Sequence, residues 1–226
     1  MAKFDWHSVA KEQWDQQAQF WNKRSTNMWD NGSRKDIIPF VEKYNKSGSD
    51  ILDVGCGDGY GSFKLQQLGY NVTGVDISSE MISKAMQRTK NISFIQSDMN
   101  ELPFESGKFD GIMCINVLEW TEVPANSLQE LKRVLKNDGY VCVGILGPTA
   151  GPRSNGYPRL YGNDTISNTM MPWEFGMLAK EKGFTHIDGF GVYKQGVTER
   201  NYQDLPVELK QALTFMWVFM LQKVGD

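Results

Sequence analysis

The chain has 226 residues, of which 40% are hydrophobic and 23% are charged, and its formal net charge is −3. This length suits one domain with a substantial core, and the composition is that of a globular protein, neither disordered nor fibrous. The slightly acidic balance provides no overall positive field, and no run of Lys or Arg is visible, so a nucleic-acid partner is not expected.

The three cysteines, Cys56, Cys114 and Cys142, form no C-x-x-C pair, and no His lies at metal-ligand spacing from them. We therefore expect no metal site and a reducing compartment. The first residues lack the long apolar core of a signal peptide, and the most apolar stretch, 213–221, is too short to cross a bilayer. A cytoplasmic protein without a membrane partner is the expectation.

The first fifty residues are expected to form a separate, mostly helical segment. Four of the seven tryptophans lie here, namely Trp6, Trp14, Trp21 and Trp29. They either anchor helices to the rest of the fold or close over a binding pocket, and both readings stay open. Arg34 lies near the start of a helix that leads to the first strand.

Residues 51–59 read Ile-Leu-Asp-Val-Gly-Cys-Gly-Asp-Gly and predict a buried strand, a tight loop and the start of a helix. Glycine allows a sharp turn and a close approach of a ligand. Open α/β folds bind nucleotides at such turns. The dinucleotide pattern G-x-G-x-x-G is not met, because Tyr60 or Ser62 stands at its third glycine. Asp53 would repel a pyrophosphate and attract a cationic ligand.

Strand-like and helix-like stretches alternate after this loop, which predicts a parallel sheet with helices on both faces. We expect strands at 51–54, 70–76, 92–95, 109–115 and 140–146, and helices from Ser79 and over 128–135. Asp76 ends the second strand, where a carboxylate either accepts hydrogen bonds from two ribose hydroxyls or caps the following helix.

The last third of the chain begins with a stretch rich in Gly, Pro, Asn and Tyr, 147–168, which we interpret as a long functional loop. A helix over 172–181, a strand over 184–193 and a helical stretch from Pro206 follow. Residues 216–224 are so apolar that periodicity alone does not distinguish a strand from the end of a helix.

Together these motifs resemble the class I S-adenosylmethionine-dependent methyltransferases that act on small molecules. The resemblance rests on D-x-G-x-G-x-G at 53–59, on Asp76, on L-P-F…F-D within 102–110 and on the strand end at 114–120. It implies a Rossmann-like, seven-stranded, mostly parallel sheet with helices on both faces, an antiparallel C-terminal strand and N-terminal helices. It therefore favours a strand over 216–224.

The resemblance also implies a single domain over 1–226. This domain comprises an N-terminal helical cap over 1–48, a cofactor-binding core over 49–146, and a substrate loop with a C-terminal hairpin region over 147–226.

The implied cofactor is S-adenosylmethionine. Asp98 matches the acid that accepts a hydrogen bond from the adenine amino group, Ile77 and Met99 would pack on the purine, and Asn116 lies where the methionine part binds. We add Arg34 as a partner for the methionine carboxylate and Trp21 as part of the roof. The expected cofactor-binding residues are Asp53, Gly55, Cys56, Gly57, Gly59, Asp76, Ile77, Ser97, Asp98, Met99, Asn116, Arg34 and Trp21.

The expected function is methyl transfer to a small-molecule acceptor by in-line displacement. Trp120 replaces the His that relatives often carry, so no general base is assigned, and His7 and His186 are more typical of structural residues. The nucleic-acid signature D/N-P-P-Y/F is absent. The expected acceptor-binding residues are Trp120, Arg153, Tyr157, Arg159 and Tyr161.

Two alternatives stay open. The first is a non-catalytic S-adenosylmethionine-binding regulatory protein, which would retain the cofactor motifs but lack an acceptor pocket. The second is an NAD(P)-dependent oxidoreductase, which would need the missing third glycine. The acceptor itself and the oligomeric state do not follow from the sequence.

Overall fold

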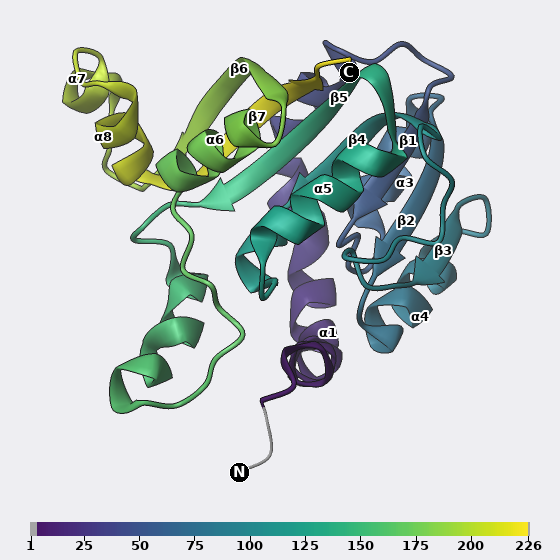
Figure 1. The fold of residues 1–226 in the computed structure, drawn as a ribbon, viewed down its shortest axis with the longest axis horizontal. Coiled ribbons are helices and arrows are strands. Elements are labelled where there is room, and N and C mark those ends of the chain that lie inside the picture. Colours follow the sequence, from purple (N-terminus) through teal and green to yellow (C-terminus); the bar gives the residue numbers. More distant parts are fainter. Residues whose placement is uncertain (1–3, 226) are drawn as a thin grey trace.

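A seven-stranded sheet forms the centre of the protein (Figure 1). The computed structural model describes residues 4–225. The strands are β1 (Asp50–Val54), β2 (Asn71–Asp76), β3 (Ser93–Gln96), β4 (Phe109–Ile115), β5 (Leu135–Leu146), β6 (Phe184–Tyr193) and β7 (Thr214–Lys223). Their order is β3-β2-β1-β4-β5-β7-β6. Neighbours from β3 to β5 are parallel, whereas β7 is antiparallel to both β5 and β6. The predicted fold class is confirmed, and 216–224 lies largely in a strand.

Ten helical segments surround the sheet within residues 4–225. They are α1 (Trp6–Asp30), α2 (Ile37–Glu42), α3 (Tyr60–Gln67), α4 (Ser79–Arg88), α5 (Pro124–Val134), α6 (Pro172–Glu181), α7 (Glu199–Tyr202), α8 (Val207–Ala212) and the 3₁₀ helices η1 (Leu118–Trp120) and η2 (Gly151–Tyr161). The structure differs from the expectation in several places. Strand β5 already starts at Leu135, which was expected to end the preceding helix, and α7 was not expected. Helix α5 starts at Pro124, because proline suits a first helical position, and the expected loop 147–168 contains η2.

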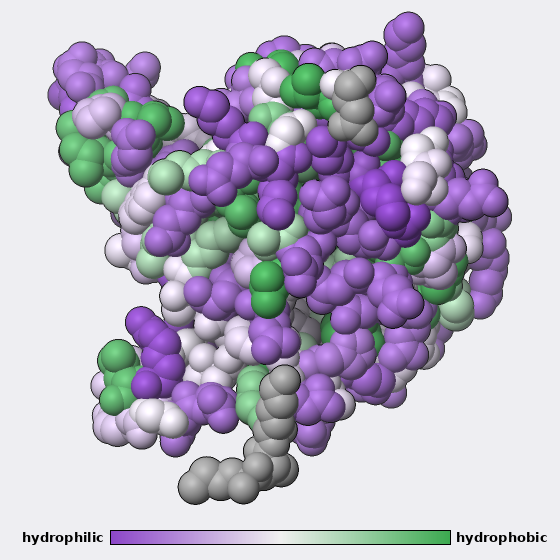
Figure 2. All heavy atoms as spheres, viewed as in Figure 1, coloured by the Kyte–Doolittle hydropathy of each residue, from purple (hydrophilic) through white to green (hydrophobic). Residues whose placement is uncertain are grey.

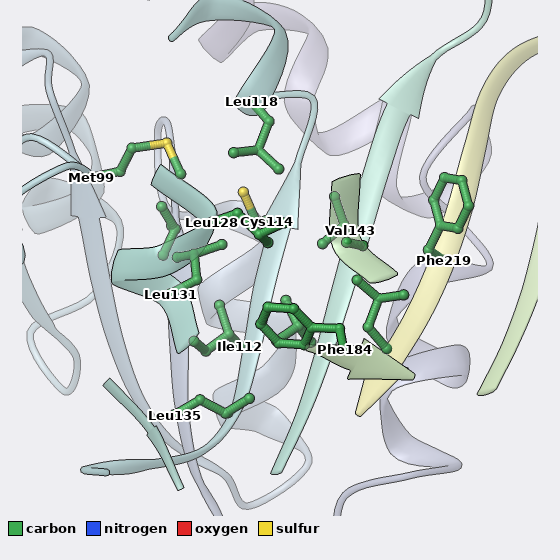
Figure 3. Packing of buried hydrophobic residues seen from close by; sticks show 14 of the residues in the cluster. Met99, Ile112, Cys114, Leu118, Leu128, Leu131, Leu135, Val143, Phe184 and Phe219 are labelled. Carbon is green, nitrogen blue, oxygen red and sulfur yellow. The ribbon is translucent and has the colours of Figure 1, made fainter. Parts of the chain in front are cut away.

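The alternation of side chains along the strands produces two apolar layers. Leu52 and Val54 of β1 belong to the layer under α5 and α6, whereas Ile51 belongs to the layer under α1 to α4. In Figure 3, Leu128 and Leu131 of α5 lie beside side chains of β4 in the first layer. Both faces are therefore covered, and ligands can reach the sheet chiefly at the ends of its strands.

Helix α1 is long enough to contact both the sheet layer and the strand ends. Its Trp29 packs so closely on α3 that a Cβ on Gly61 would lie 2.5 Å from the indole ring. Further toward the N-terminus, Asp15 Oδ1 accepts hydrogen bonds from Ser78 Oγ at 2.6 Å and from Glu80 N at 3.1 Å. Asp15 thus holds α1 to the first turn of α4, so the N-terminal half of α1 lies at the carboxyl ends of the strands.

The surface seen in Figure 2 is largely hydrophilic, with small apolar patches scattered over it. No helix among residues 4–225 is long and apolar enough to span a membrane.

Candidate functional site

A cavity of about 250 Å³ lies between α1 and the carboxyl ends of the central strands. Its walls contain all the residues expected to bind a cofactor except Asp53 and Gly59. These wall residues are Trp21, Arg34, Gly55, Cys56, Gly57, Asp76, Ile77, Ser97, Asp98, Met99 and Asn116. They come from α1, the turn before α2, and the ends of β1 to β4, so the fold gathers them from several separate segments.

The glycines of the loop after β1 serve different purposes. Gly55 has φ +66°, and a Cβ at this position would lie 2.3 Å from Val117 Cγ2, so only glycine fits where the loop passes the end of β4. Gly59 has φ +75° and precedes α3; its Cβ would lie 2.9 Å from the Cβ of Ala85. Gly59 lies outside the cavity walls, and what it allows is the close packing of α3 against α4.

Asp53 is turned away from the cavity. Its side chain is buried, and Oδ2 accepts a hydrogen bond of 2.6 Å from Ser62 Oγ of α3. Burial raises the pKa of Asp53 to about 7, although Ser62 and the charge of Arg34 oppose this shift. Asp53 is thus placed to hold the start of α3 and to act on a bound charge through the electrostatic field.

Asp76 lies in the cavity wall and fixes the Gly loop. Its Oδ2 accepts a hydrogen bond of 2.9 Å from Gly57 N, and its Oδ1 accepts one of 2.9 Å from Ser78 N. Burial raises the pKa of Asp76 to about 6, against the effect of these two amides. A carboxylate offers about four lone-pair sites, so each oxygen retains capacity for a ligand hydroxyl.

Arg34 supplies a positive charge in the cavity wall. Its guanidinium carbon lies 5.4 Å from the ring centroid of Trp29. Burial lowers the pKa of Arg34, while the carboxyl groups of Asp53 and Asp58 favour its charged form. No carboxylate within residues 4–225 forms an ion pair with it. The guanidinium is therefore available to an anionic group in the cavity.

The first turn of α1 bridges two sides of the cavity. Trp6 Nε1 donates a hydrogen bond of 2.8 Å to the carbonyl oxygen of Trp120, and His7 Nδ1 lies 2.8 Å from Asp98 Oδ2. Asp98 Oδ1 also accepts a hydrogen bond from Asn100 N. From the sequence, His7 was expected to be a structural residue. Because 91 positions separate it from Asp98, no local sequence pattern reveals this pair.

The residues expected to bind the acceptor separate into two groups. Trp120 is buried in the cavity wall, but the other four lie outside it. Arg153 donates to the carbonyl oxygens of Gly147 and Met170, and Arg159 donates to that of Gly156. Both guanidinium groups therefore stabilise the loop backbone.

Tyr157 and Tyr161 are exposed on η2, which extends from the body of the fold at the lower left of Figure 1. The wall beside Trp120 consists instead of Trp6 and Trp14, two of the tryptophans for which a place over a pocket was left open, and of Leu146, Pro152 and Phe215, which the sequence did not indicate.

Glu119 is a second functional candidate that the sequence did not single out. Its side chain is 1% exposed, Oε1 accepts a hydrogen bond of 2.5 Å from Leu146 N, and Oε2 has no hydrogen-bond partner among residues 4–225. Burial raises the pKa of Glu119. Its carbonyl oxygen accepts a hydrogen bond from Asn168 N. Glu119 thus ties η1 to the end of β5 and to the segment after η2.

The chemistry of the wall fits S-adenosylmethionine. Asp76 provides a half-buried acceptor for vicinal hydroxyls, and Arg34 provides a free cation for a carboxylate. A Cβ at Gly57 would approach Met81 Sδ at 3.9 Å, so this glycine leaves room for a ligand against the backbone. Ile77 and Met99 provide apolar surface for a flat ring. No group of three or more His, Cys, Asp or Glu within 4–225 is arranged to hold a metal ion.

Comparison with known proteins agrees with this chemistry. Residues 52–143 match the family model described as a methyltransferase domain. A ubiquinone biosynthesis O-methyltransferase of Actinobacillus pleuropneumoniae is 30% identical over 146 residues, which are 56% of this chain and 62% of that protein. A malonyl-[acyl-carrier protein] O-methyltransferase of Pectobacterium atrosepticum is 28% identical over 127 residues, which are 56% of this chain and 50% of that protein. This chain thus spans about half to three fifths of these two relatives.

A solved SAM-dependent methyltransferase from Methanosarcina mazei has the same fold. It superposes with a TM-score of 0.66 at 21% identity, over 83% of this chain and 98% of the other. At this identity the likeness concerns the fold alone, and the matched residues 52–143 carry the family assignment. They include the Gly loop, Asp76 and Asp98. The match over residues 52–143, together with these methyltransferase relatives, supports the class I S-adenosylmethionine-dependent methyltransferase family.

Proposed function

We propose that the protein transfers the methyl group of S-adenosylmethionine to a small-molecule acceptor. The observation that carries this proposal is that one cavity is lined by two kinds of residue, which we assign to two ends from the strands and helices that carry them. The first end, on the β1 to β4 side, contains Asp76, Asp98 and Arg34. The second end, beside Trp120 and Phe215, continues past Asn116 toward β5 and β7. A cofactor at the first end would present its reactive group to a molecule at the second.

Each cofactor contact follows from the chemistry of a wall residue. Asp76 accepts hydrogen bonds from the ribose hydroxyls, and Arg34 binds the carboxylate of the methionine part. Asp98 accepts a hydrogen bond from the adenine amino group, for which His7 has to share or release Asp98 Oδ2. Asn116 has φ +58° at the end of β4 and presents its backbone to the methionine part.

The cofactor supplies a methyl group on a sulfonium, whose departure as a neutral thioether needs no acid. A lone pair of the acceptor forms the new bond to the methyl carbon, the carbon–sulfur bond breaks, and its electrons stay on sulfur. Any proton on the attacking atom passes to water. The residues of the chain have to hold the acceptor atom about 3 Å from the methyl carbon and exclude water. Trp6 and Trp120 narrow the cavity where this exclusion is needed.

The second end of the cavity favours an enzyme over a regulatory protein that only binds the cofactor. A sensor needs no additional cavity beyond its ligand, whereas here six wall residues from α1, η1, β5, η2 and β7 enclose further space. An NAD(P)-dependent oxidoreductase is disfavoured, because the pyrophosphate would lie near the carboxyls of Asp53 and Asp76.

Isothermal calorimetry with S-adenosylmethionine, S-adenosylhomocysteine and NADH tests the cofactor. We expect micromolar binding of the first two and none of NADH. A screen of small molecules with the cofactor labelled in its methyl group then tests turnover. Binding without transfer to any acceptor would support the regulatory protein, and binding of NADH alone would contradict both proposals.

A further inference from the structure

We infer that the acceptor is a neutral, ring-bearing molecule and that the acceptor end of the cavity excludes anions. This inference rests on the proposed function and specifies its substrate class. The acceptor end is the part of the wall formed by Trp6, Trp14, Trp120, Leu146, Pro152 and Phe215.

Aromatic rings make up most of this wall. Trp14 and Trp120 meet edge to face, with ring centroids 5.5 Å apart and an interplanar angle of 74°. Both belong, with Phe215, to a small apolar cluster built on Leu146 and Ala150. Flat rings at such distances favour another ring packed against them. Because the cluster joins four separate segments of the chain, its shape is fixed before a ligand arrives.

Most polar groups of this wall are already engaged, although Trp14 Nε1 donates to no group among residues 4–225. Trp6 Nε1 donates to the carbonyl oxygen of Trp120, and Trp120 Nε1 donates to that of Asn116 at 3.0 Å. Thr121, which also lines this end, donates its hydroxyl to the carbonyl oxygen of Leu118. A charged acceptor group buried here would find few free donors, which is costly in a low-dielectric site.

The charges near the acceptor end oppose an anion. Arg153 directly follows the wall residue Pro152 in the chain. Its guanidinium donates hydrogen bonds to the carbonyl oxygens of Gly147 and Met170 and lies outside the wall. The charged wall residue at this end, within 4–225, is the exposed acid Glu122. A carboxylate or phosphate on the acceptor would face this acid, while Arg34, the unpaired cation of the same wall, is assigned to the methionine carboxylate of the cofactor.

The attacking atom follows from the same wall. A protonated amine has no lone pair for methyl transfer, and the histidine of the wall within 4–225, His7, is paired with Asp98. The acceptor therefore attacks through an atom with a free lone pair at neutral pH, such as a ring nitrogen, or through a hydroxyl oxygen whose proton passes to water as the new bond forms.

A matched pair of probes, 1-naphthol and 1-naphthoate, tests the inference by calorimetry on the protein saturated with S-adenosylhomocysteine. Both carry the same rings and differ in charge. We expect 1-naphthol to bind at least about tenfold more tightly, which corresponds to about 1.4 kcal/mol. Trp14→Ala and Phe215→Ala should each lower the affinity for 1-naphthol several-fold. The affinity for S-adenosylhomocysteine should stay within twofold of the wild-type value. Trp14→Arg should reverse the preference toward 1-naphthoate.

Phe20→Ala is the matched control, since Phe20 is an exposed ring of α1 outside the cavity wall, and it should change neither affinity. Equal or tighter binding of 1-naphthoate by the wild type would overturn the inference, as would 1-naphthol binding that is indifferent to both alanine variants. The pair is also measured on the ligand-free protein. Loss of S-adenosylhomocysteine binding would count against the proposed function, whereas the probe preference would still decide on the acceptor class.

Discussion

His7 Nδ1 and Asp98 Oδ2 lie 2.8 Å apart, although 91 positions separate the two residues in the chain. The neighbouring Trp6 reaches in another direction, to the carbonyl oxygen of Trp120. Adjacent residues of α1 thus contact the loop after β3 and the 3₁₀ helix η1. The first turn of α1 consequently closes over the cavity. Asp98, which is proposed to accept a hydrogen bond from the adenine amino group, is already paired with His7.

Removing the histidine should speed ligand exchange. In His7→Ala, the first turn of α1 loses one of its two side-chain contacts across the cavity, and Asp98 loses a competitor of the adenine. An exposed pair of this kind contributes about 0.2–1 kcal/mol, so we expect association and dissociation of S-adenosylhomocysteine to become up to about fivefold faster. Stopped-flow tryptophan fluorescence measures both rates.

His186→Ala is the control for this experiment, because His186 lies on β6 against Phe219, outside the cavity wall. Unchanged exchange rates in His7→Ala would show that the contact with Asp98 does not restrain α1.

Asp76 should determine cofactor affinity and its dependence on pH. Asp76→Asn replaces a charged hydrogen-bond acceptor in the wall. It should make the binding free energy of S-adenosylhomocysteine less favourable by about 1–3 kcal/mol. Because the pKa of Asp76 is raised to about 6, the wild type should bind more weakly as pH falls through 6. Calorimetry between pH 5 and 8 should show a smaller slope in the variant.

Asp110→Asn provides the matched control, since Asp110 binds Asp50 N and Lys136 at the opposite ends of the strands. It should lower stability without lowering affinity. Equal affinities of Asp76→Asn and the wild type at pH 8 would contradict the assigned contact.

Arg34 should act on the amino-acid part of the ligand alone. Arg34→Gln should make the binding free energy of S-adenosylhomocysteine less favourable by about 1.5–3 kcal/mol, the range for a hydrogen bond to a charged group. 5′-Methylthioadenosine has the same adenosine and sulfur but no carboxylate, so its affinity should stay within twofold. Calorimetry with both ligands distinguishes this local contact from a general loss of the site, which would weaken them equally.

Asp53 should lower stability as pH rises. Its pKa is about 7 in the folded protein and about 3.9 in an unfolded chain, so between these values the folded state binds more protons. The free energy of unfolding contributed by Asp53 therefore falls as pH rises through this window. Between pH 4 and pH 7.5, the free energy of unfolding of Asp53→Asn should rise by roughly 1–4 kcal/mol relative to that of the wild type.

Urea denaturation at the two pH values measures this difference. A constant difference between variant and wild type would show that Asp53 is ionised throughout the range.

Two glycines with the same φ of +66° separate backbone strain from steric exclusion. A Cβ added at Gly107 would have nothing within 4 Å, whereas at Gly55 it would overlap Val117. Gly107→Ala should lower the free energy of unfolding by about 1–2 kcal/mol, the penalty for a residue with a Cβ in the left-handed region. Gly55→Ala should cost more and should abolish S-adenosylhomocysteine binding. Thermal unfolding and calorimetry test this, and equal costs with intact binding would contradict it.

Local chemistry in the sequence determined most of the fold and the cofactor end of the site. Asp76 ends a strand, the Gly loop, Asp98 and Asn116 each come after one, and the parallel order of β1 to β4 brings those strand ends together. Ser78 accepts a hydrogen bond from Met81 N at the start of α4, as its residue type predicts. Such features depend on neighbours in the chain, and therefore the sequence displays them.

Only the tertiary structure decided the rest. Trp6, Trp14, Leu146 and Phe215 meet Trp120 because β7 inserts beside β5 and α1 crosses the strand ends, and no pattern of neighbours encodes that meeting. Arg153 resembles a ligand-binding residue in sequence, yet the loop carbonyls engage it. Long-range packing determines which side chains reach a cavity, because a polar group binds whichever partner the folded chain brings within hydrogen-bond distance.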